Sequence, residues 1–284
     1  MTGTKALVLG GGGIAGLGWF AGLLYGLHEC GVDLRDADQM IGTSAGSVTA
    51  AQLRSAQSIE TLYARQTDPT LIIGEPPPSA DQFAALMAAY PKFMAITDTA
   101  RRMQAMGSFA RSAKAVAPGV RLTMIERRLS EHDWPDAALS ITAVDLETSA
   151  LVTFDARSGV SLVVAIAASC AVPGVWPVVE IHGRAYMDGG VYSADNAQLA
   201  SGAERALILS PLGGVATAPS GLGLSDQVSS LQNAGVKVLV IEPDAAARAA
   251  MGSNPFDPAI RAPTAVAAKA QGKAIAQTVS EFWA

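Results

Sequence analysis

The chain has 284 residues, of which 50% are hydrophobic and 16% are charged, so it can bury a large core without cross-links. The net charge is −5 and no run of basic residues occurs, which argues against a nucleic-acid partner and against binding an anionic membrane by charge alone. The two cysteines, Cys30 and Cys170, lie far apart in apolar contexts and match no metal-binding pattern. We therefore expect buried free thiols in a reducing compartment.

The first sixty residues contain the pattern strand, turn and helix twice. Residues 6–9 predict a buried strand, and residues 16–27 carry apolar side chains at helical spacing, with Gly31 as the C-terminal cap. Residues 39–41 predict a second strand, and a helix is expected through residues 48–53. Two such units in succession predict an α/β layered domain.

The N-terminal apolar stretch has the length of a membrane span, because residues 6–27 carry no charge. Its eight glycines, four of them consecutive, make a poor helix interior. A signal peptide is not expected either, since Lys5 alone is a thin basic region and no cleavage site follows. The sequence thus predicts a cytoplasmic location without a transmembrane helix.

The middle of the chain, about residues 70–120, predicts a helical insertion. Prolines at 76–78 break the chain, an apolar stripe follows over residues 83–94, and a second one runs from residue 103 to the Pro118-Gly119 pair. Pro91 is expected to kink or divide the first helix. The favoured interpretation of these methionine-rich helices is ordinary core, and the alternative is a lid over an apolar substrate channel.

Regular α/β signals return in the second half of the chain, which shows no internal repeat and no long linker. Residues 1–284 are therefore predicted to form one domain. The elements expected here are strands at 139–144, 151–154, 206–209 and 236–241, helices at 161–170 and 264–282, and a hairpin over 178–187 that turns near His182-Gly183.

The segment Gly42-Thr43-Ser44-Ala45-Gly46 matches the pattern of a nucleophile elbow, with a strand before it and a helix after it. A serine hydroxyl needs exposure on a sharp turn to act as a nucleophile, and Gly42 and Gly46 relieve the crowding of such a turn. By itself the pattern is common by chance, so its context must support it. Ser44 is the candidate nucleophile.

The candidate base for Ser44 is Asp188, which begins the Asp188-Gly189-Gly190 sequence at the end of an apolar strand. A hairpin turn or a turn at the end of the strand is the alternative interpretation of this Asp-Gly pair. The expected order of a triad, with histidine last, fails because no histidine follows Asp188. His28 is expected at a helix end, while His132 and His182 remain alternative bases. An aspartate base requires a dry site that raises its pKa.

A glycine-rich loop follows the first strand and would supply backbone N–H groups to an oxyanion. The candidate donors are Gly11, Gly12, Gly13 and Ile14, with Gly16 as a supporting residue. The same spacing matches a dinucleotide-binding loop, which makes a nucleotide-binding oxidoreductase the competing interpretation. Against it, no second strand ends in an acidic residue at the required distance. Instead, a polar stretch contains the nearby acids Asp33, Asp36 and Asp38.

These three motifs in this order resemble the patatin-like phospholipase family. The matching segments are residues 10–16, 42–46 and 188–190, with further likeness at residues 143–148 and 168–173. The resemblance extends from about residue 5 to residue 215. One position departs from the family pattern, because Ala15 stands where a lysine or arginine is common.

The resemblance implies a three-layer α/β/α sandwich with a mostly parallel central sheet. It also implies a Ser44–Asp188 dyad that forms an acyl-enzyme without a histidine, a cofactor or a metal. The expected substrate is a lipid or another acyl ester, reached through transient contact with a membrane surface. Ala15 removes a cation next to the oxyanion loop and favours a neutral ester or a lysolipid. A lipid-binding member without catalysis remains an alternative.

Overall fold

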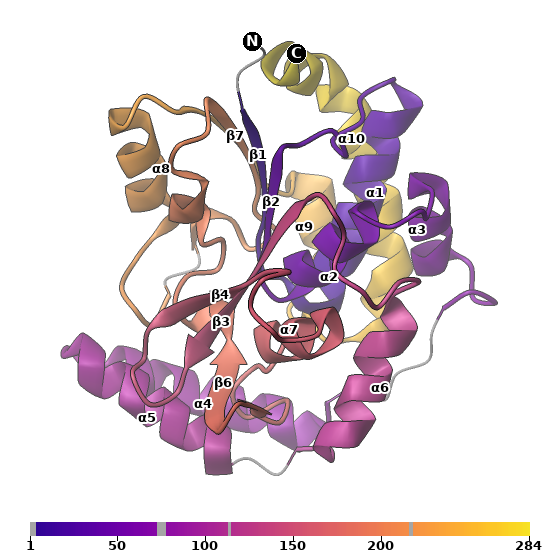
Figure 1. The fold of residues 1–284 in the computed structure, drawn as a ribbon. Coiled ribbons are helices and arrows are strands. Elements are labelled where there is room, and N and C mark those ends of the chain that lie inside the picture. Colours follow the sequence, from indigo (N-terminus) through magenta and orange to yellow (C-terminus); the bar gives the residue numbers. More distant parts are fainter. Residues whose placement is uncertain (1–3, 73–77, 113–114, 216–217) are drawn as a thin grey trace.

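The fold comes from a computed structural model that describes residues 4–72, 78–112, 115–215 and 218–284 (Figure 1). Most of the proline segment expected to break the chain lies outside the described residues. Among those residues, eight strands form a single sheet in the order β5-β6-β3-β2-β1-β7-β8, with β4 paired to β3. Neighbours from β3 through β2, β1 and β7 to β8 are parallel, whereas β4, β5 and β6 pair antiparallel.

The elements follow one another in an α/β order that is interrupted, within the described residues, by a run of five helices between the second and the third strand. The strands are β1 (Lys5–Leu9), β2 (Gln39–Gly42), β3 (Ala138–Asp145), β4 (Leu151–Phe154), β5 (Val179–Ile181), β6 (Arg184–Asp188), β7 (Arg205–Leu209) and β8 (Lys237–Ile241). The helices are α1 (Gly13–Glu29), α2 (Ala45–Leu53), α3 (Ile59–Thr67), α4 (Ala80–Met94), α5 (Thr99–Ser112), α6 (Pro118–Arg128), α7 (Leu162–Ser169), α8 (Leu224–Asn233), α9 (Ala245–Met251) and α10 (Arg261–Trp283). Short 3₁₀ turns are η1 (Gly189–Val191), η2 (Ala197–Ala200), η3 (Gly213–Val215) and η4 (Pro258–Ile260).

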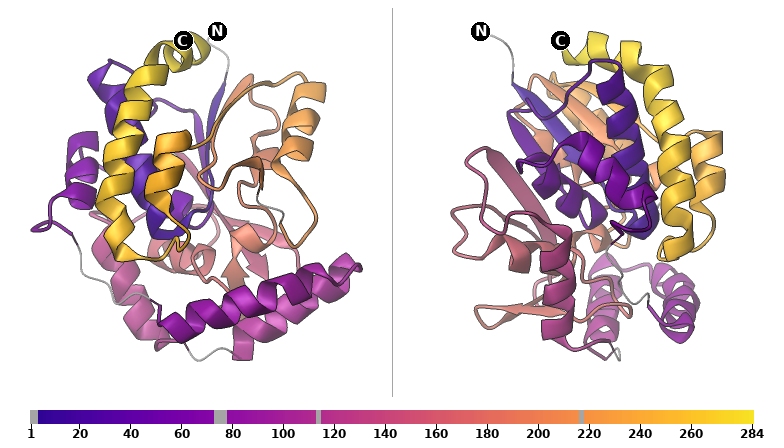
Figure 2. Two further views of the ribbon diagram at one scale, coloured as in Figure 1. Left: turned by 180° about the vertical axis from the view of Figure 1, so that it is seen from behind. Right: turned by 90° about the vertical axis from the view of Figure 1, so that its right-hand side faces the viewer.

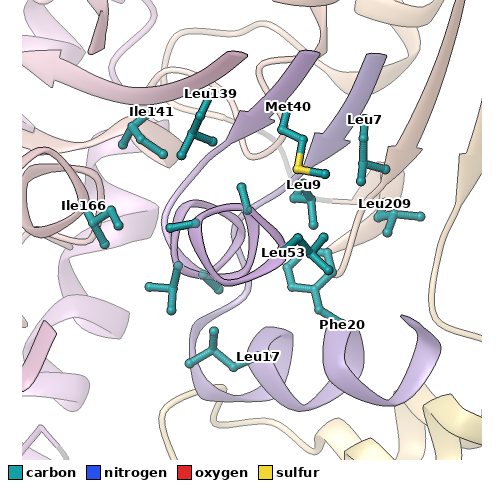
Figure 3. Close-up of a cluster of buried hydrophobic side chains, with 14 of the residues drawn as sticks. Leu7, Leu9, Leu17, Phe20, Met40, Leu53, Leu139, Ile141, Ile166 and Leu209 are labelled. Atoms are coloured by element: carbon teal, nitrogen blue, oxygen red, sulfur yellow. The ribbon is translucent and has the colours of Figure 1, made fainter. Parts of the chain in front are cut away.

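The sheet is buried on both faces, because alternate residues of each central strand enter different hydrophobic clusters. Leu7 and Leu9 join the larger cluster beneath α1, α2 and α7, whereas Ala6 and Val8 join a smaller cluster beneath α8. Figure 3 shows the larger cluster, in which Leu9 and Leu209 of the sheet lie near Phe20 of α1. The helical layers on the two faces confirm the predicted α/β/α architecture.

Strand β3 sets the position of two segments that are far apart in the sequence. Its first half pairs with β2, where Ile141 lies opposite Gly42, and its second half pairs with β6, where Ala143 lies opposite Asp188. The two partner positions on β3 are thus only two residues apart. The chain just beyond β2 and the end of β6 are therefore brought together at one place along the sheet.

Helices α4 and α5 pack against each other across the end of the molecule opposite the two chain termini (Figures 1 and 2). The described part of α4 carries no buried residue, whereas Met103 and Met106 of α5 are buried in a cluster with strands β3 and β6. The core interpretation is therefore right for these methionines of α5, whereas the described part of α4 packs against the buried clusters only through half-buried side chains such as Leu86 and Phe93. Within the described residues, no helix combines the length and the apolar character needed to cross a membrane.

Most of the predicted elements are confirmed, and the exceptions have local causes. Gly31 caps α1 as expected, since its φ is 82° and Val32 N–H donates to Leu27 O in the bonding pattern of a Schellman cap. Helix α4 continues through Pro91 and ends three residues later, so the proline does not divide it. Pro118 begins α6 instead of ending a helical region, because proline is well suited to a first helical turn. Both thiols are free, but Cys30 is exposed and not buried as expected.

Candidate active site

A cavity of about 360 Å³ opens at the carboxyl ends of the parallel strands, where ligands of open α/β sheets bind. Both Ser44 and Asp188 line it, together with the glycine loop. Asp188 is the only charged residue that lines the cavity within the described part of the chain. The remaining lining is mostly apolar and comes from Phe83, Leu86, Met87, Tyr90, Met106, Val172, Pro173, Val191, Leu212, Pro219, Pro255 and Phe256.

Ser44 lies on the turn between β2 and α2 with φ 53° and ψ −116°. Such a conformation costs a non-glycine residue about 1–3 kcal/mol and persists only where neighbouring groups hold it. The Ser44 N–H donates to Ser169 Oγ at 2.9 Å, and the Ser47 hydroxyl donates to Ser44 O at 2.6 Å. Ser44 is therefore held from both sides in a strained backbone conformation, as the predicted elbow requires.

The glycines on either side of Ser44 are required by close backbone packing. A Cβ at Gly42 would lie 2.5 Å from Ser47 Cα, and one at Gly46 would overlap the carbonyl group of Leu9. Gly46 N–H also donates to Gly10 O at 3.1 Å. Helix α2 can thus begin directly against the end of β1, which brings Ser44 next to the glycine loop.

Asp188 ends strand β6 and is only 4% exposed. The hairpin before it turns through His182 and Gly183, whose φ values of 51° and 77° are those of a type I′ turn. The Asp188 Oδ1 atom accepts the N–H of Gly190 at 2.7 Å. The predicted hairpin is therefore present, and the turn is made by His182-Gly183 rather than by Asp188-Gly189.

Burial raises the pKa of Asp188 to about 7, against smaller lowering effects of the Ser44 hydroxyl, the Gly190 N–H and the charge of Arg121. Asp188 Oδ2 is buried without a hydrogen bond of normal geometry within the described residues. The Ser44 hydroxyl is thus close to the carboxyl without being fully aligned, as is common before a ligand binds. A carboxylate with a pKa near neutrality can accept a proton from a neighbouring hydroxyl.

The glycine loop presents backbone donors to the same cavity. Among the described residues, the N–H groups of Gly12, Gly13 and Ile14 have no hydrogen-bond partner, as is usual at the start of a helix. Gly11 differs, because its N–H donates to Ala194 O at 2.7 Å. The predicted donor set is corrected accordingly, since Gly11 lines the cavity without a free N–H. Ile14 does not line this cavity but a smaller adjoining pocket, which Gly13 and Ser44 also line.

Two helix N-termini meet at this cavity, because Gly12 precedes α1 and Ser44 precedes α2. Neither helix has an acidic side chain in its first turn to offset the partial positive charge of that end. The two helices lie close together, since a Cβ placed on Gly16 of α1 would lie 3.4 Å from the Cβ of Ala45 in α2. The close approach of the two helices places both positive ends beside Ser44, where they would favour a negative charge.

The histidines and the other acidic candidates lie outside the cavity. His28, His132 and His182 are all within the described residues, and none of them lines it. Asp36 and Asp38 bond to Lys5 at the start of β1, which is the end of the strand opposite the glycine loop. Asp33 pairs with Arg35. Acids in these positions cannot hold the ribose of a dinucleotide on the glycine loop.

The sequence model of the family described as Patatin-like phospholipase matches residues 7–201 of the chain. The chain belongs to the patatin-like phospholipase family. This family assignment agrees with the resemblance of the three motifs, all of which lie within the matched region. No curated protein matches the chain.

The solved structures that are similar to the chain include two of which the chain covers 53% each. The type III effector protein ExoU is 16% identical with a TM-score of 0.42 over 97% of this chain. VipD from Legionella pneumophila is 14% identical with a TM-score of 0.41 over 87% of this chain. The chain thus spans about half the length of either protein.

Proposed function

We propose that this patatin-like protein hydrolyses acyl esters of lipid-like substrates, with Ser44 as the nucleophile and Asp188 as its base. The observation that carries the proposal is the shared cavity. It joins a strained serine, a carboxyl with a raised pKa and the glycine loop, in which the N–H groups of Gly12 and Gly13 have no partner among the described residues, and the rest of its lining is mostly apolar. An apolar wall suits an acyl chain, and the polar groups suit the ester that ends it.

In the proposed reaction, Asp188 accepts the hydroxyl proton of Ser44 while Ser44 Oγ attacks the ester carbonyl carbon. The N–H groups of Gly12, Gly13 and Ile14 stabilise the oxyanion of the tetrahedral intermediate. When this intermediate collapses, the C–O bond to the alcohol breaks, and the leaving alcohol takes the proton from Asp188. Water then attacks the carbonyl carbon of the acyl-enzyme and gives one proton to Asp188. When the second tetrahedral intermediate collapses, the C–O bond to Ser44 breaks, Asp188 returns the proton to Ser44 Oγ, and the fatty acid is released.

Removal of either member of the dyad tests the proposal. Ser44→Ala and Asp188→Asn should each lower the turnover of p-nitrophenyl esters by at least about 10⁴-fold, because removing one member of such a unit costs nearly as much as removing all of it. His132→Ala and His182→Ala serve as controls and should keep the wild-type rate. Asp188→Asn with most of its activity intact would reassign the base.

Covalent labelling tests the nucleophile without a natural substrate. A fluorophosphonate probe should add one equivalent to the wild type at Ser44, none to Ser44→Ala, and react slowly with Asp188→Asn. A panel of lysophospholipids, phospholipids and neutral esters then defines the substrate. We propose that neutral esters and lysolipids are turned over faster than diacyl phospholipids, because Ala15 brings no cation to the loop. The panel also tests the opposite effect of Arg121 and Arg128, which line a small adjoining pocket together with Gly13 and Ser44. An unlabelled wild type that hydrolyses no ester would end the proposal.

A further inference from the structure

A four-residue turn at residues 193–196 contacts every part of the candidate site. Ala194 O accepts the N–H of Gly11 in the glycine loop, and the side chain of Asp195 packs directly against Gly10. Asn196 reaches both Thr43, next to Ser44, and Gly189, next to Asp188. No motif assigns a role to this turn, yet it joins the glycine loop, the serine elbow and the aspartate.

The side chain of Asn196 is the centre of these contacts and is completely buried. Its Nδ2 group donates to Ser193 O at 2.8 Å and Gly189 O at 3.2 Å, and it lies 3.0 Å from Thr43 Oγ1 and 3.4 Å from Thr142 Oγ1. Because carbonyl oxygens only accept, these two contacts fix the NH₂ group on this side of the amide. The backbone of Asn196 is left-handed, with φ 52° and ψ 37°, a conformation that asparagine tolerates well.

We propose that Asn196 is a positioning residue that holds the Ser44 elbow and the Asp188 carboxyl at a fixed separation. The inference rests on the proposed function, because a fixed separation matters only if Asp188 takes the proton of Ser44. Thr43 Oγ1 also bonds to Thr142 Oγ1 at 2.8 Å, so the amide joins the turn after β2, strand β3 and η1 in one buried network. Gly189 O, which accepts from Asn196, and Gly190 N–H belong to the same peptide group. Asn196 thus also holds the Gly190 N–H, which bonds to Asp188 Oδ1.

Two substitutions separate hydrogen bonding from packing and backbone strain. Asn196→Gly removes the side chain while glycine accepts the positive φ without cost. Asn196→Asp keeps the size but replaces the NH₂ group by an oxygen, which would face the carbonyls of Ser193 and Gly189. Gln271→Ala is the matched control, because this buried amide bonds to Trp19 and to Glu242 O, and none of these residues lines the cavity.

If Asn196 positions the two reacting groups, its variants should lose more in the rate of hydrolysis than their loss of stability explains. We expect both Asn196 variants to lower kcat for p-nitrophenyl butyrate by about 10²-fold, the scale of a misplacement near 1 Å, with KM changed less than about threefold. Gln271→Ala should lower Tm by a comparable amount and leave kcat unchanged at 25 °C. An unchanged kcat in the Asn196 variants, or a loss of kcat in Gln271→Ala of the same size, would overturn the inference.

The titration of Asp188 gives a readout that packing alone would not move. The Gly190 N–H lowers the pKa of Asp188, so loosening this bond should raise that pKa and move the carboxyl titration to higher pH. The other titratable groups that interact with Asp188 are Arg121 and Cys170, and the variants keep both.

Carboxyl ¹³C NMR of Asp188, assigned by its loss in Asp188→Asn, measures this shift in wild type, Asn196→Gly and Gln271→Ala. The result does not depend on turnover, so it decides the inference even if the wild type hydrolyses no ester. A titration of Asn196→Gly that coincides with the wild type would contradict the role proposed for Asn196. An upward shift confined to Asn196→Gly would support it.

Discussion

The two walls of the cavity are built in opposite ways. The polar wall consists of the Ser44 elbow, the glycine loop and Asp188, held by backbone hydrogen bonds and by contacts too close for a Cβ. The apolar wall includes one face of α4, whose described side chains are exposed or half-buried, and Met87 is 54% exposed. Reacting groups need fixed distances, whereas an apolar chain needs only a surface of the right size. We therefore expect substitutions in the polar wall to damage folding or rate, and substitutions in α4 to change substrate preference.

The largest effect on the free energy of unfolding is expected from Gly46→Ala. Its Cβ would overlap the backbone carbonyl of Leu9, which cannot move without displacing β1, so we expect a loss of more than about 4 kcal/mol or no soluble protein. Urea unfolding followed by circular dichroism measures the change. Gly119→Ala is the matched control, because a Cβ there meets open space on α6 and should stabilise the protein by up to about 1 kcal/mol. A Gly46→Ala variant as stable as wild type would refute the close-packing account of the elbow.

A smaller effect on stability, of opposite sign, is expected from Asp188→Asn. The pKa of Asp188 is about 7 in the folded protein against an ordinary value of 3.8. The contribution of this group to the free energy of unfolding is therefore fully present below about pH 4. It is lost as the pH rises through 7, because the buried carboxyl must then ionise. At 1.36 kcal/mol for each pKa unit, the difference corresponds to about 4 kcal/mol as an upper bound. Asp188→Asn should thus be more stable than wild type at pH 8 and similar to it at pH 4.

Thermal unfolding of the two proteins at pH 4, 6 and 8 measures this change. The carboxyl of Asp195, which burial also brings to a pKa of about 7, is kept in both proteins and cancels in the comparison. A stability difference that does not grow with pH would show that Asp188 is not desolvated in the folded protein.

Much of the polar wall could be predicted from the sequence, because its features are local. Gly31, the His182-Gly183 turn and the glycines around Ser44 are each required by a backbone conformation or contact within a few residues. Asn196 and Ser169 could not be found in this way, since their partners Thr43 and Ser44 lie more than 120 residues away. Only the pairing of β2 and β6 with β3 brings these residues together.

The helices missed in the sequence show where local signals are weak. Helix α8 begins after Gly223 without a side-chain cap of its own. Helix α6 begins at Pro118, a residue type that the sequence pattern alone associates equally well with the end of a helix. Helix α4 was interpreted as core because apolar periodicity alone does not distinguish packing against a core from lining a cavity. This ambiguity concerns the apolar wall, where the substrate is expected to bind.

The pH dependence of hydrolysis is the next prediction in order of size. Asp188 accepts a proton only when it is ionised, so kcat/KM should fall below an apparent pKa of about 7 and be about 100-fold lower at pH 5 than at its plateau. Initial rates with p-nitrophenyl butyrate between pH 5 and 9 measure the profile, with the absorbance corrected for p-nitrophenol ionisation. A rate that stays constant from pH 5 to pH 8 would exclude a base of this pKa.

The smallest effect on the fold, and the one most specific to the apolar wall, is expected from Met87→Trp. Met87 lies on the exposed face of α4 and also lines the cavity, so a larger ring there should shorten the space for an acyl chain. We expect kcat/KM for a p-nitrophenyl ester of a long chain to fall by about 3- to 10-fold relative to the butyrate ester, with stability changed by less than about 0.5 kcal/mol. Val266→Trp is the control, since Val266 is 57% exposed on α10 and does not line the cavity. If both variants keep the wild-type ratio of long-chain to short-chain rates, α4 does not contact the acyl chain. The expectation that substitutions in α4 change substrate preference would then be wrong.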